Sequence, residues 1–193
     1  MAALQKQGEK FLKCLGYRVM KINIVLTGFM ATGKTAVGRV LAQQMGIDFV
    51  DTDDDIESVT GKRITEIFNK YGVTRFRSEE ALAIKRVSER KGIVIATGGG
   101  AVLNPENVRA LKVNGVLVLL KCSPEVIYSR VIGGRNRPLL SKGENLLQQI
   151  RDLMSEREAI YLASADLEIF SCGESREEVA SMIINKLRER KYI

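Results

Sequence analysis

The 193-residue sequence predicts an α/β fold in which helices flank both faces of a parallel sheet. Short apolar runs rich in β-branched residues alternate with longer amphipathic segments, and glycines end several of the runs. Parallel strands need crossover connections, so this alternation favours a sheet that is covered on both sides. The length favours one domain, residues 21–193, after an N-terminal extension, residues 1–20.

Five segments are expected to form strands, because each is short and apolar and gives way to glycine, polar residues or a helix start. In chain order they are residues 22–27, 49–51, 93–97, 115–120 and 167–170. The first is rich in β-branched side chains and ends at a glycine, which is typical of a buried strand.

The segments between the strands are expected to form helices, because apolar residues recur at helical spacing or a proline stands in the first turn. In chain order they are residues 35–45, 53–60, 64–71 and 74–90, two helices beginning at Pro105 and Pro124, a long helix ending near Ala163, and a terminal helix from Glu174. Residues 133–144 are polar and rich in glycine and arginine, which predicts a mobile lid.

The composition excludes several kinds of catalytic and metal site. The chain has no histidine, which excludes Ser-His-Asp and Cys-His nucleophile systems and histidine metal sites. Its three cysteines lie far apart, as expected for a reducing cytoplasm rather than a zinc site. No apolar run approaches the roughly 18 residues of a membrane span, so no membrane partner is expected.

The net charge of +7 is compatible with nucleic acid, anionic lipid or a phosphorylated ligand. No basic stripe is interleaved with aromatic residues, as a nucleic-acid surface would require. A pocket for a phosphorylated small molecule is therefore the favoured interpretation, with no nucleic-acid partner.

Residues 28–35 carry the clearest functional motif. They read Gly-Phe-Met-Ala-Thr-Gly-Lys-Thr and match G-x-x-x-x-G-K-[ST] between an expected strand and an expected helix. The glycines let backbone amides wrap around phosphates, and the helix N-terminus adds a positive dipole end. Lys34 can reach the β- and γ-phosphates, and the Thr35 hydroxyl can bind Mg²⁺. The motif predicts a site for a nucleoside triphosphate.

Four carboxylates lie within residues 51–55, directly after the second expected strand. If the strand persists, period-two alternation puts Asp51 and Asp53 on the same side, although one carboxylate could instead cap the next helix. Beside a phosphate loop, these groups could hold hydrated Mg²⁺ and a substrate hydroxyl. The strand at 93–97 does not end in Asp-Glu, which argues against a mechanochemical ATPase.

Three further features indicate a small substrate. The glycine triplet 98–100 closes a strand at the carboxyl edge of the sheet, where backbone can approach a ligand closely. Arg77 and Glu80 stand three residues apart on a helix, so the carboxylate can orient the guanidinium. Arg137 lies in the expected lid, and closing a loop arginine over phosphates is a common device in phosphoryl transfer.

The combined motifs resemble those of the shikimate kinases, within the nucleoside-monophosphate-kinase-like P-loop family. The resemblance covers about residues 22–190 and rests on G-F-M-x-T-G-K-T, D-T-D-x-x-I-E, F-R-x-x-E, T-G-G-G-A-V, R-P-L-L and R-x-x-x-Y. These motifs stand at residues 28–35, 51–57, 76–80, 97–102, 137–140 and 157–161. The resemblance implies a five-stranded parallel sheet of P-loop kinase type and ATP-dependent phosphorylation of shikimate to shikimate 3-phosphate, a step of aromatic amino acid biosynthesis. We expect a cytoplasmic monomer.

The resemblance also implies roles for single residues. Asp53 would hold the ring hydroxyls and accept the hydroxyl proton, while Arg77 and Arg157 would bind the carboxylate. Thr35 would serve Mg²⁺ directly and Asp51 would serve it through water. The implied substrate-binding residues are Asp53, Arg77, Gly98, Gly99, Gly100 and Arg157. The implied ATP-binding residues are Ala31, Thr32, Gly33, Lys34, Thr35, Ala36, Val37, Arg130, which would lie against adenine, and Arg137. The implied catalytic residues are Asp53, Lys34 and Arg137.

The chain departs from the family pattern at two places. Val73 stands where the motif G-E-x-x-F-R has an acidic residue, and Arg75 follows in the same motif. Residues 171–176 read Ser-Cys-Gly-Glu-Ser-Arg, where the family usually has a basic residue and a proline. No adenine-contacting side chain is assigned there.

Two other functions stay open on the sequence. One is a kinase for another small acid or nucleotide, such as gluconate or a nucleoside monophosphate. The other is a nucleic-acid-binding P-loop protein, which would hydrolyse ATP in response to DNA or RNA. A panel of acceptors with coupled ADP release separates these possibilities.

Overall fold

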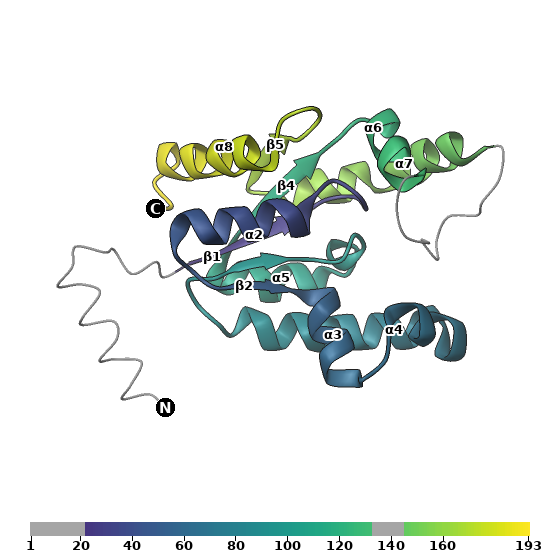
Figure 1. The fold of residues 1–193 in the computed structure, drawn as a ribbon. Coiled ribbons are helices and arrows are strands. Elements are labelled where there is room, and N and C mark those ends of the chain that lie inside the picture. The colour runs from purple at the N-terminus through teal and green to yellow at the C-terminus, as the bar shows by residue number, and fades with distance from the viewer. Residues whose placement is uncertain (1–21, 133–144) are drawn as a thin grey trace, which may run out of the picture.

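The computed structural model describes residues 22–132 and 145–193, and it confirms the predicted fold class. Five strands form one parallel sheet in the order β2-β3-β1-β4-β5 (Figure 1). Their bounds are β1 (Asn23–Thr27), β2 (Phe49–Asp51), β3 (Val94–Ala96), β4 (Gly115–Lys121) and β5 (Leu167–Phe170). The expected N-terminal extension and lid, residues 1–20 and 133–144, lie outside the described residues, so both stay predictions.

The helices also follow the expected order. They are α2 (Lys34–Met45), α3 (Thr52–Thr60), α4 (Ile64–Ser88), α5 (Pro105–Asn114), α6 (Pro124–Ile132), α7 (Leu146–Ser164) and α8 (Arg176–Glu189), with a short 3₁₀ turn η1 (Ala101–Leu103). The expected break between 71 and 74 is a kink in α4 at Gly72, which has φ 78°. The terminal helix begins two residues after Glu174, because Ser175 and Glu178 form a capping box at its start.

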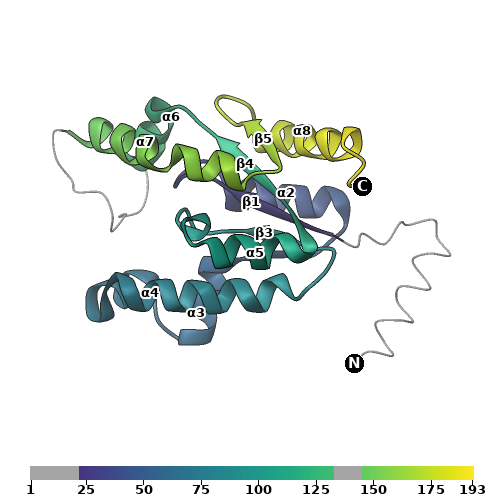
Figure 2. The same cartoon turned by 180° about the vertical axis from the view of Figure 1, so that it is seen from behind.

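Helices cover both faces of the sheet, as the alternating pattern predicted. The side chains of Ile24 and Leu26 in β1 pack with α2 and α8, whereas Val25 packs with α4, α5 and α7 on the opposite face. Figures 1 and 2 show these two helical layers from opposite sides. The three β1 side chains are completely buried, so hydrophobic packing fixes the central strand from both sides.

The order of the strands determines where a ligand can bind. β1 lies between β3 and β4, so the chain leaves the middle of the sheet first toward one edge and later toward the other. Ligands in open α/β sheets bind at this switch point, beyond the carboxyl ends of the strands. Asp51 ends β2 and Thr97 follows β3, and both stand at the same edge as the loop after β1. In the described ranges, no helix is long and apolar enough to cross a membrane.

A third, smaller apolar cluster supports α3 and the first part of α4. It consists of Ile56, Ile67, Phe76 and Ala83, with Ile64 and Phe68 packed against it. Phe76 immediately precedes Arg77, and the two phenylalanine rings lie 4.5 Å apart between centroids. This cluster therefore holds the part of α4 that carries the expected substrate arginine.

Gly38 allows α2 to lie close to β2. A Cβ atom at this position would lie 2.5 Å from Cε2 of Phe49 and 3.2 Å from Cδ1 of Leu26. The close approach brings the start of α2 to the end of β2, where the Thr35 hydroxyl donates to Asp51 Oδ2 at 2.7 Å. The distance between Thr35 and Asp51 thus depends on the absence of a side chain at Gly38.

Replacing Gly38 with alanine should destabilise the fold. The added methyl group overpacks the interface with Phe49, and we expect a loss of about 1–2 kcal/mol in the free energy of unfolding after the gain in helix propensity. Urea unfolding measures this loss. Combining Gly38→Ala with Phe49→Leu should recover part of the stability, and an equal loss in the double variant would rule out the ring contact as its cause.

Candidate active site

The loop after β1 has the geometry of a phosphate-binding loop. Gly28 has φ 136°, and a Cβ atom there would lie 2.5 Å from the Leu120 carbonyl oxygen. Gly33 has φ 97° and caps α2 without a side chain, which leaves the first amides of the helix to a ligand. The loop also holds Ala31 at φ 59°, a backbone conformation that a non-glycine residue rarely adopts.

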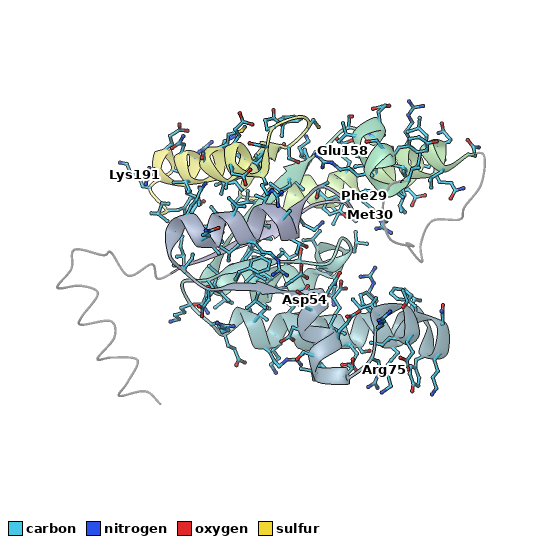
Figure 3. All side chains as sticks on the ribbon, in the orientation of Figure 1. Phe29, Met30, Asp54, Arg75, Glu158 and Lys191 are labelled. Carbon is cyan, nitrogen blue, oxygen red and sulfur yellow. The ribbon has the colours of Figure 1, made fainter. Side chains whose placement is uncertain are left out.

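Seven of the expected ATP-binding residues lie in this loop and the first turn of α2. They are Ala31, Thr32, Gly33, Lys34, Thr35, Ala36 and Val37. Lys34 is almost buried, and its ammonium group donates to the Gly28 and Phe29 carbonyl oxygens at 2.9 and 2.7 Å. Figure 3 shows Phe29 and Met30 of this loop above Asp54, which lies near the start of α3. The loop is therefore already closed around its lysine.

Arg130 connects the phosphate loop to the loop that follows β5. Its guanidinium donates to the Ala31 and Ser171 carbonyl oxygens, each at 3.1 Å. The Ser171 hydroxyl in turn donates to the Thr32 carbonyl oxygen at 3.2 Å. The sequence assigns no adenine-contacting side chain in residues 171–176, and the structure places Ser171 of this segment against the phosphate loop. The expected contact of Arg130 with adenine stays a prediction, and Arg137 lies outside the described residues.

The strand does not persist past Asp51, so the condition for placing Asp51 and Asp53 on the same side by alternation is not met. β2 ends at Asp51, and its side chain caps α3 by accepting a hydrogen bond from the Asp53 amide at 2.9 Å. The alternative that one of the four carboxylates caps the helix is therefore confirmed for Asp51. The other oxygen of Asp51 still faces the loop, because it accepts the hydrogen bond from Thr35.

The remaining carboxylates have different surroundings. Asp54 and Asp55 form ion pairs with Arg39 and Arg86 at 3.2 and 2.6 Å, on the exposed side of α3. Asp53 instead faces the glycine triplet, because a Cβ atom at Gly98 would lie 3.0 Å from Asp53 Oδ1. The Asp53 carboxylate thus lies beside the triplet, and its expected role in substrate binding stays a prediction.

The glycine triplet leaves room for three charged side chains. The Gly98 amide donates to the buried Thr52 hydroxyl at 3.1 Å, which ties the triplet to α3. A Cβ atom at Gly98 would lie 2.8 Å from Glu80 Oε1, and one at Gly100 would overlap the Arg77 guanidinium. Asp53, Arg77 and Glu80 therefore converge here because these two positions carry no side chain.

The expected pairing of Arg77 with Glu80 is present. Arg77 Nη1 lies 2.5 Å from Glu80 Oε2, whose side chain is only 1% exposed. Val73 stands where the family motif has an acidic residue. Its side chain is exposed on the surface, so this difference leaves the Arg77–Glu80 pair intact. Arg75 pairs separately with the nearly buried Glu79 at 2.5 Å. The departure from the family motif therefore does not reach the guanidinium that the substrate would meet.

Burial raises the pKa of Glu80, and the Arg77 charge beside it offsets part of that effect. A carboxylate in this environment is held in place by its guanidinium partner rather than by water. Glu80 thus fixes the direction of the Arg77 side chain at the edge of the glycine triplet.

Tyr161 is a site residue to which sequence reasoning gave no role, although it closes the R-x-x-x-Y motif. Its side chain is buried, and its hydroxyl donates a hydrogen bond to the Gly99 carbonyl oxygen. The charges of Arg157, Arg77 and Glu80 act on the same hydroxyl. The four-residue spacing, which places both side chains on one face of α7, could have indicated that Arg157 and Tyr161 lie close together.

Comparisons with known proteins identify one family. The family model described as shikimate kinase matches residues 30–188. A shikimate kinase from Pelotomaculum thermopropionicum is 50% identical over 171 residues, which cover 89% of this chain and 98% of that protein. One from Thermodesulfovibrio yellowstonii is 48% identical and covers 85% of this chain and 94% of that protein. The structure of a shikimate kinase from Acinetobacter baumannii in complex with shikimate is 37% identical, with a TM-score of 0.85 over 90% of this chain and 96% of the other.

Glu80 should make stability depend on pH in a predictable direction. Its pKa in the folded protein lies above the ordinary value of 4.5, so its contribution to stability is fully present below pH 4.5 and is lost as the pH rises through the folded pKa. The Glu80→Gln variant has no titratable group at this position. As the pH rises through the folded pKa of Glu80, the wild type should therefore lose stability relative to this variant. Urea unfolding of both proteins at a series of pH values measures the difference, and a difference that stays constant or grows with pH would contradict this account.

Proposed function

Because this chain belongs to the shikimate kinase family, we propose that it transfers the γ-phosphoryl group of ATP to a hydroxyl of shikimate, giving shikimate 3-phosphate and ADP. One observation carries this proposal. A phosphate-binding loop and a half-buried arginine paired with a buried glutamate lie at the same edge of the sheet, with Asp53 and three glycines beside them. The phosphate-binding loop suits the phosphates of ATP. The charge pair, Asp53 and the glycines suit a small hydroxylated acid.

The phosphate half of the site is proposed to work through Lys34 and the start of α2. In the structure, Lys34 donates to carbonyl oxygens of its own loop, and the γ-phosphate would offer it a charged acceptor in their place. The amides of the first helical turn would hold the phosphate oxygens with no rearrangement of the backbone. Arg137, from the R-P-L-L motif, is proposed to add a second positive charge over the transferring group.

The acceptor half is proposed to recognise both ends of shikimate. Arg77 and Arg157 would bind the carboxylate, and bidentate contacts of this type fix orientation as well as affinity. Asp53 would hold the reacting hydroxyl and accept its proton. Because phosphoryl transfer passes through a loose transition state, the larger contribution of Asp53 would be positioning. Gly98, Gly99 and Gly100 would let the ring lie directly against the backbone.

The residues at the end of β2 fit a magnesium ion. No three acidic or sulfur side chains come together in the part of the chain that the structure describes, so an all-protein metal cage is not found there. Mg²⁺ usually takes one or two protein oxygens and completes its shell with water and phosphate. The Thr35 hydroxyl and the Asp51 carboxylate lie 2.7 Å apart at the loop and are the proposed ligands, the latter through water. When bound, the ion would neutralise charge on the phosphate oxygens.

The proposed enzyme is a cytoplasmic monomer that needs no nucleic acid. ATP is its phosphoryl donor, and Cys122 and Cys172 are free thiols, which suits a reducing compartment. Each described side chain assigned above comes from one chain, so the proposed chemistry does not require a second copy. The assay that follows also tests gluconate and a nucleoside monophosphate as alternative acceptors.

Coupled ADP release with shikimate and Mg²⁺ tests the proposed function, with Lys34→Ala as the defective variant. The wild type should release ADP with shikimate well above the rate with gluconate, a nucleoside monophosphate, DNA or RNA. Lys34→Ala should lose at least about a hundredfold in kcat, because a positive charge on the transferring phosphoryl group is missing. Lys91→Ala, which removes an exposed lysine outside the site, is the matched control. Activity of Lys34→Ala within about threefold of the wild type would refute its assigned role.

The carboxylate contact can be tested by changing enzyme and substrate together. Methyl shikimate lacks the negative charge, so it should be a poor acceptor for the wild type. Arg77→Ala should weaken the use of shikimate by about 2–5 kcal/mol but cost much less with the ester. Arg109→Ala, an exposed arginine on α5, is the control. Equal losses in kcat/KM for acid and ester would show that Arg77 does not read the carboxylate.

A further inference from the structure

We propose that Tyr161 is a positioning residue for the acceptor half of the site, holding the glycine triplet in the arrangement that selects a carboxylate. This inference rests on the proposed function and extends it to a residue to which that function gave no role. It is carried by the hydrogen bond of one buried hydroxyl group to the Gly99 carbonyl oxygen. No charge on Tyr161 itself is involved.

The Tyr161 hydroxyl joins two parts of the site that come from different elements. It donates its one proton to the Gly99 carbonyl oxygen, between β3 and η1. Arg157 stands four residues before Tyr161 on the same helix, and its charge acts on the hydroxyl. The hydroxyl therefore ties α7, which carries Arg157, to the glycine triplet. A phenylalanine ring could not make the bond to Gly99.

The bond to Gly99 restrains a backbone segment that has little intrinsic stiffness. Glycine adopts more backbone conformations than any other residue, so a triplet of glycines needs an external restraint to keep one of them. The peptide group is planar, so fixing the Gly99 carbonyl also fixes the direction of the Gly100 amide. Gly100 packs directly against the Arg77 guanidinium. The hydroxyl of Tyr161 therefore affects the surroundings of Arg77.

The Tyr161 ring packs in the apolar core on this face of the sheet, and its hydroxyl adds a directional contact to that packing. A cavity of about 450 Å³ borders the ring, between α7 and the ends of β4 and β5, and Phe29, Met154 and Leu162 also line this cavity. This arrangement makes Tyr161→Phe a sharp variant, because it keeps the volume of the ring and removes only the hydroxyl, whereas truncation to alanine would enlarge the cavity.

The surroundings of Tyr161 keep its hydroxyl protonated. Burial raises the pKa of Tyr161, which the charges of Arg157 and Arg77 oppose and Glu80 reinforces. The hydroxyl consequently remains a donor to Gly99 through the neutral range.

Steady-state kinetics of Tyr161→Phe test this inference, with Tyr128→Phe, a half-buried tyrosine on α6, as the matched control. We expect the KM for shikimate to rise about tenfold and the KM for ATP to stay within about twofold, because the lost bond lies in the acceptor half. The preference for shikimate over methyl shikimate in kcat/KM should fall by a similar factor. Arg77→Ala combined with Tyr161→Phe should cost less than the sum of the two single changes, because Gly100 connects the two contacts.

Each outcome decides between distinct conclusions. If the wild type did not phosphorylate shikimate, the proposed function and this inference would both be wrong. If the wild type did so and Tyr161→Phe kept both the KM for shikimate and the acid-to-ester preference, only the inference would be overturned. A lower melting temperature with unchanged acid-to-ester preference would give Tyr161 a merely structural role and would also overturn it.

Discussion

The complete burial of β1 between β3 and β4 is the constraint on which the rest of the site depends. Apolar side chains fix this strand from both faces, so the loop that follows it begins from a rigid point. Gly28 then packs against the Leu120 carbonyl of β4, and this close contact restricts the backbone of the loop that surrounds Lys34. The parallel arrangement brings the ends of β2 and β3 to the same edge. A phosphate site and an acceptor site can therefore form side by side without any long loop.

The acceptor half illustrates a conflict between stability and function. Glu80 is almost fully buried, and burial raises its pKa, so its ionised form is disfavoured in the folded protein. Its position is explained by what it does for Arg77, which it holds at the edge of the glycine triplet. A pair of apolar residues could fill the same volume at lower cost, but it could not present a guanidinium to an anionic substrate. The charge pair is thus better explained by recognition than by folding.

Much of this arrangement could be predicted from the sequence, and the failures have physical causes. Strand positions follow from apolar runs, and the phosphate loop follows from the spacing of Gly28, Gly33 and Lys34, because both signals are local. The sequence predicts the end of β2 at Asp51, but it leaves open which of the four carboxylates caps the next helix, since that depends on the side-chain bond from Asp51 to the Asp53 amide. The contacts of Ser171 and Tyr161 join segments far apart in the chain. Contacts of that kind depend on packing, and one sequence contains no direct signal for them.

The two halves of the site rest on different apolar cores. The phosphate loop is supported by the sheet, whereas Arg77 is carried by α4 over the separate cluster around Phe76. Arg157 and Tyr161 come from a third element, α7, which packs on the sheet face opposite α2. The sheet, α4 and α7 must therefore keep fixed relative positions for one small acid to contact all of its binding residues. The glycine triplet is where they meet, because Thr52, Arg77 and Tyr161 contact it from α3, α4 and α7. A short segment with no side chains thus serves as the common reference for the acceptor site, and its three neighbouring helices supply the rigidity that glycine lacks.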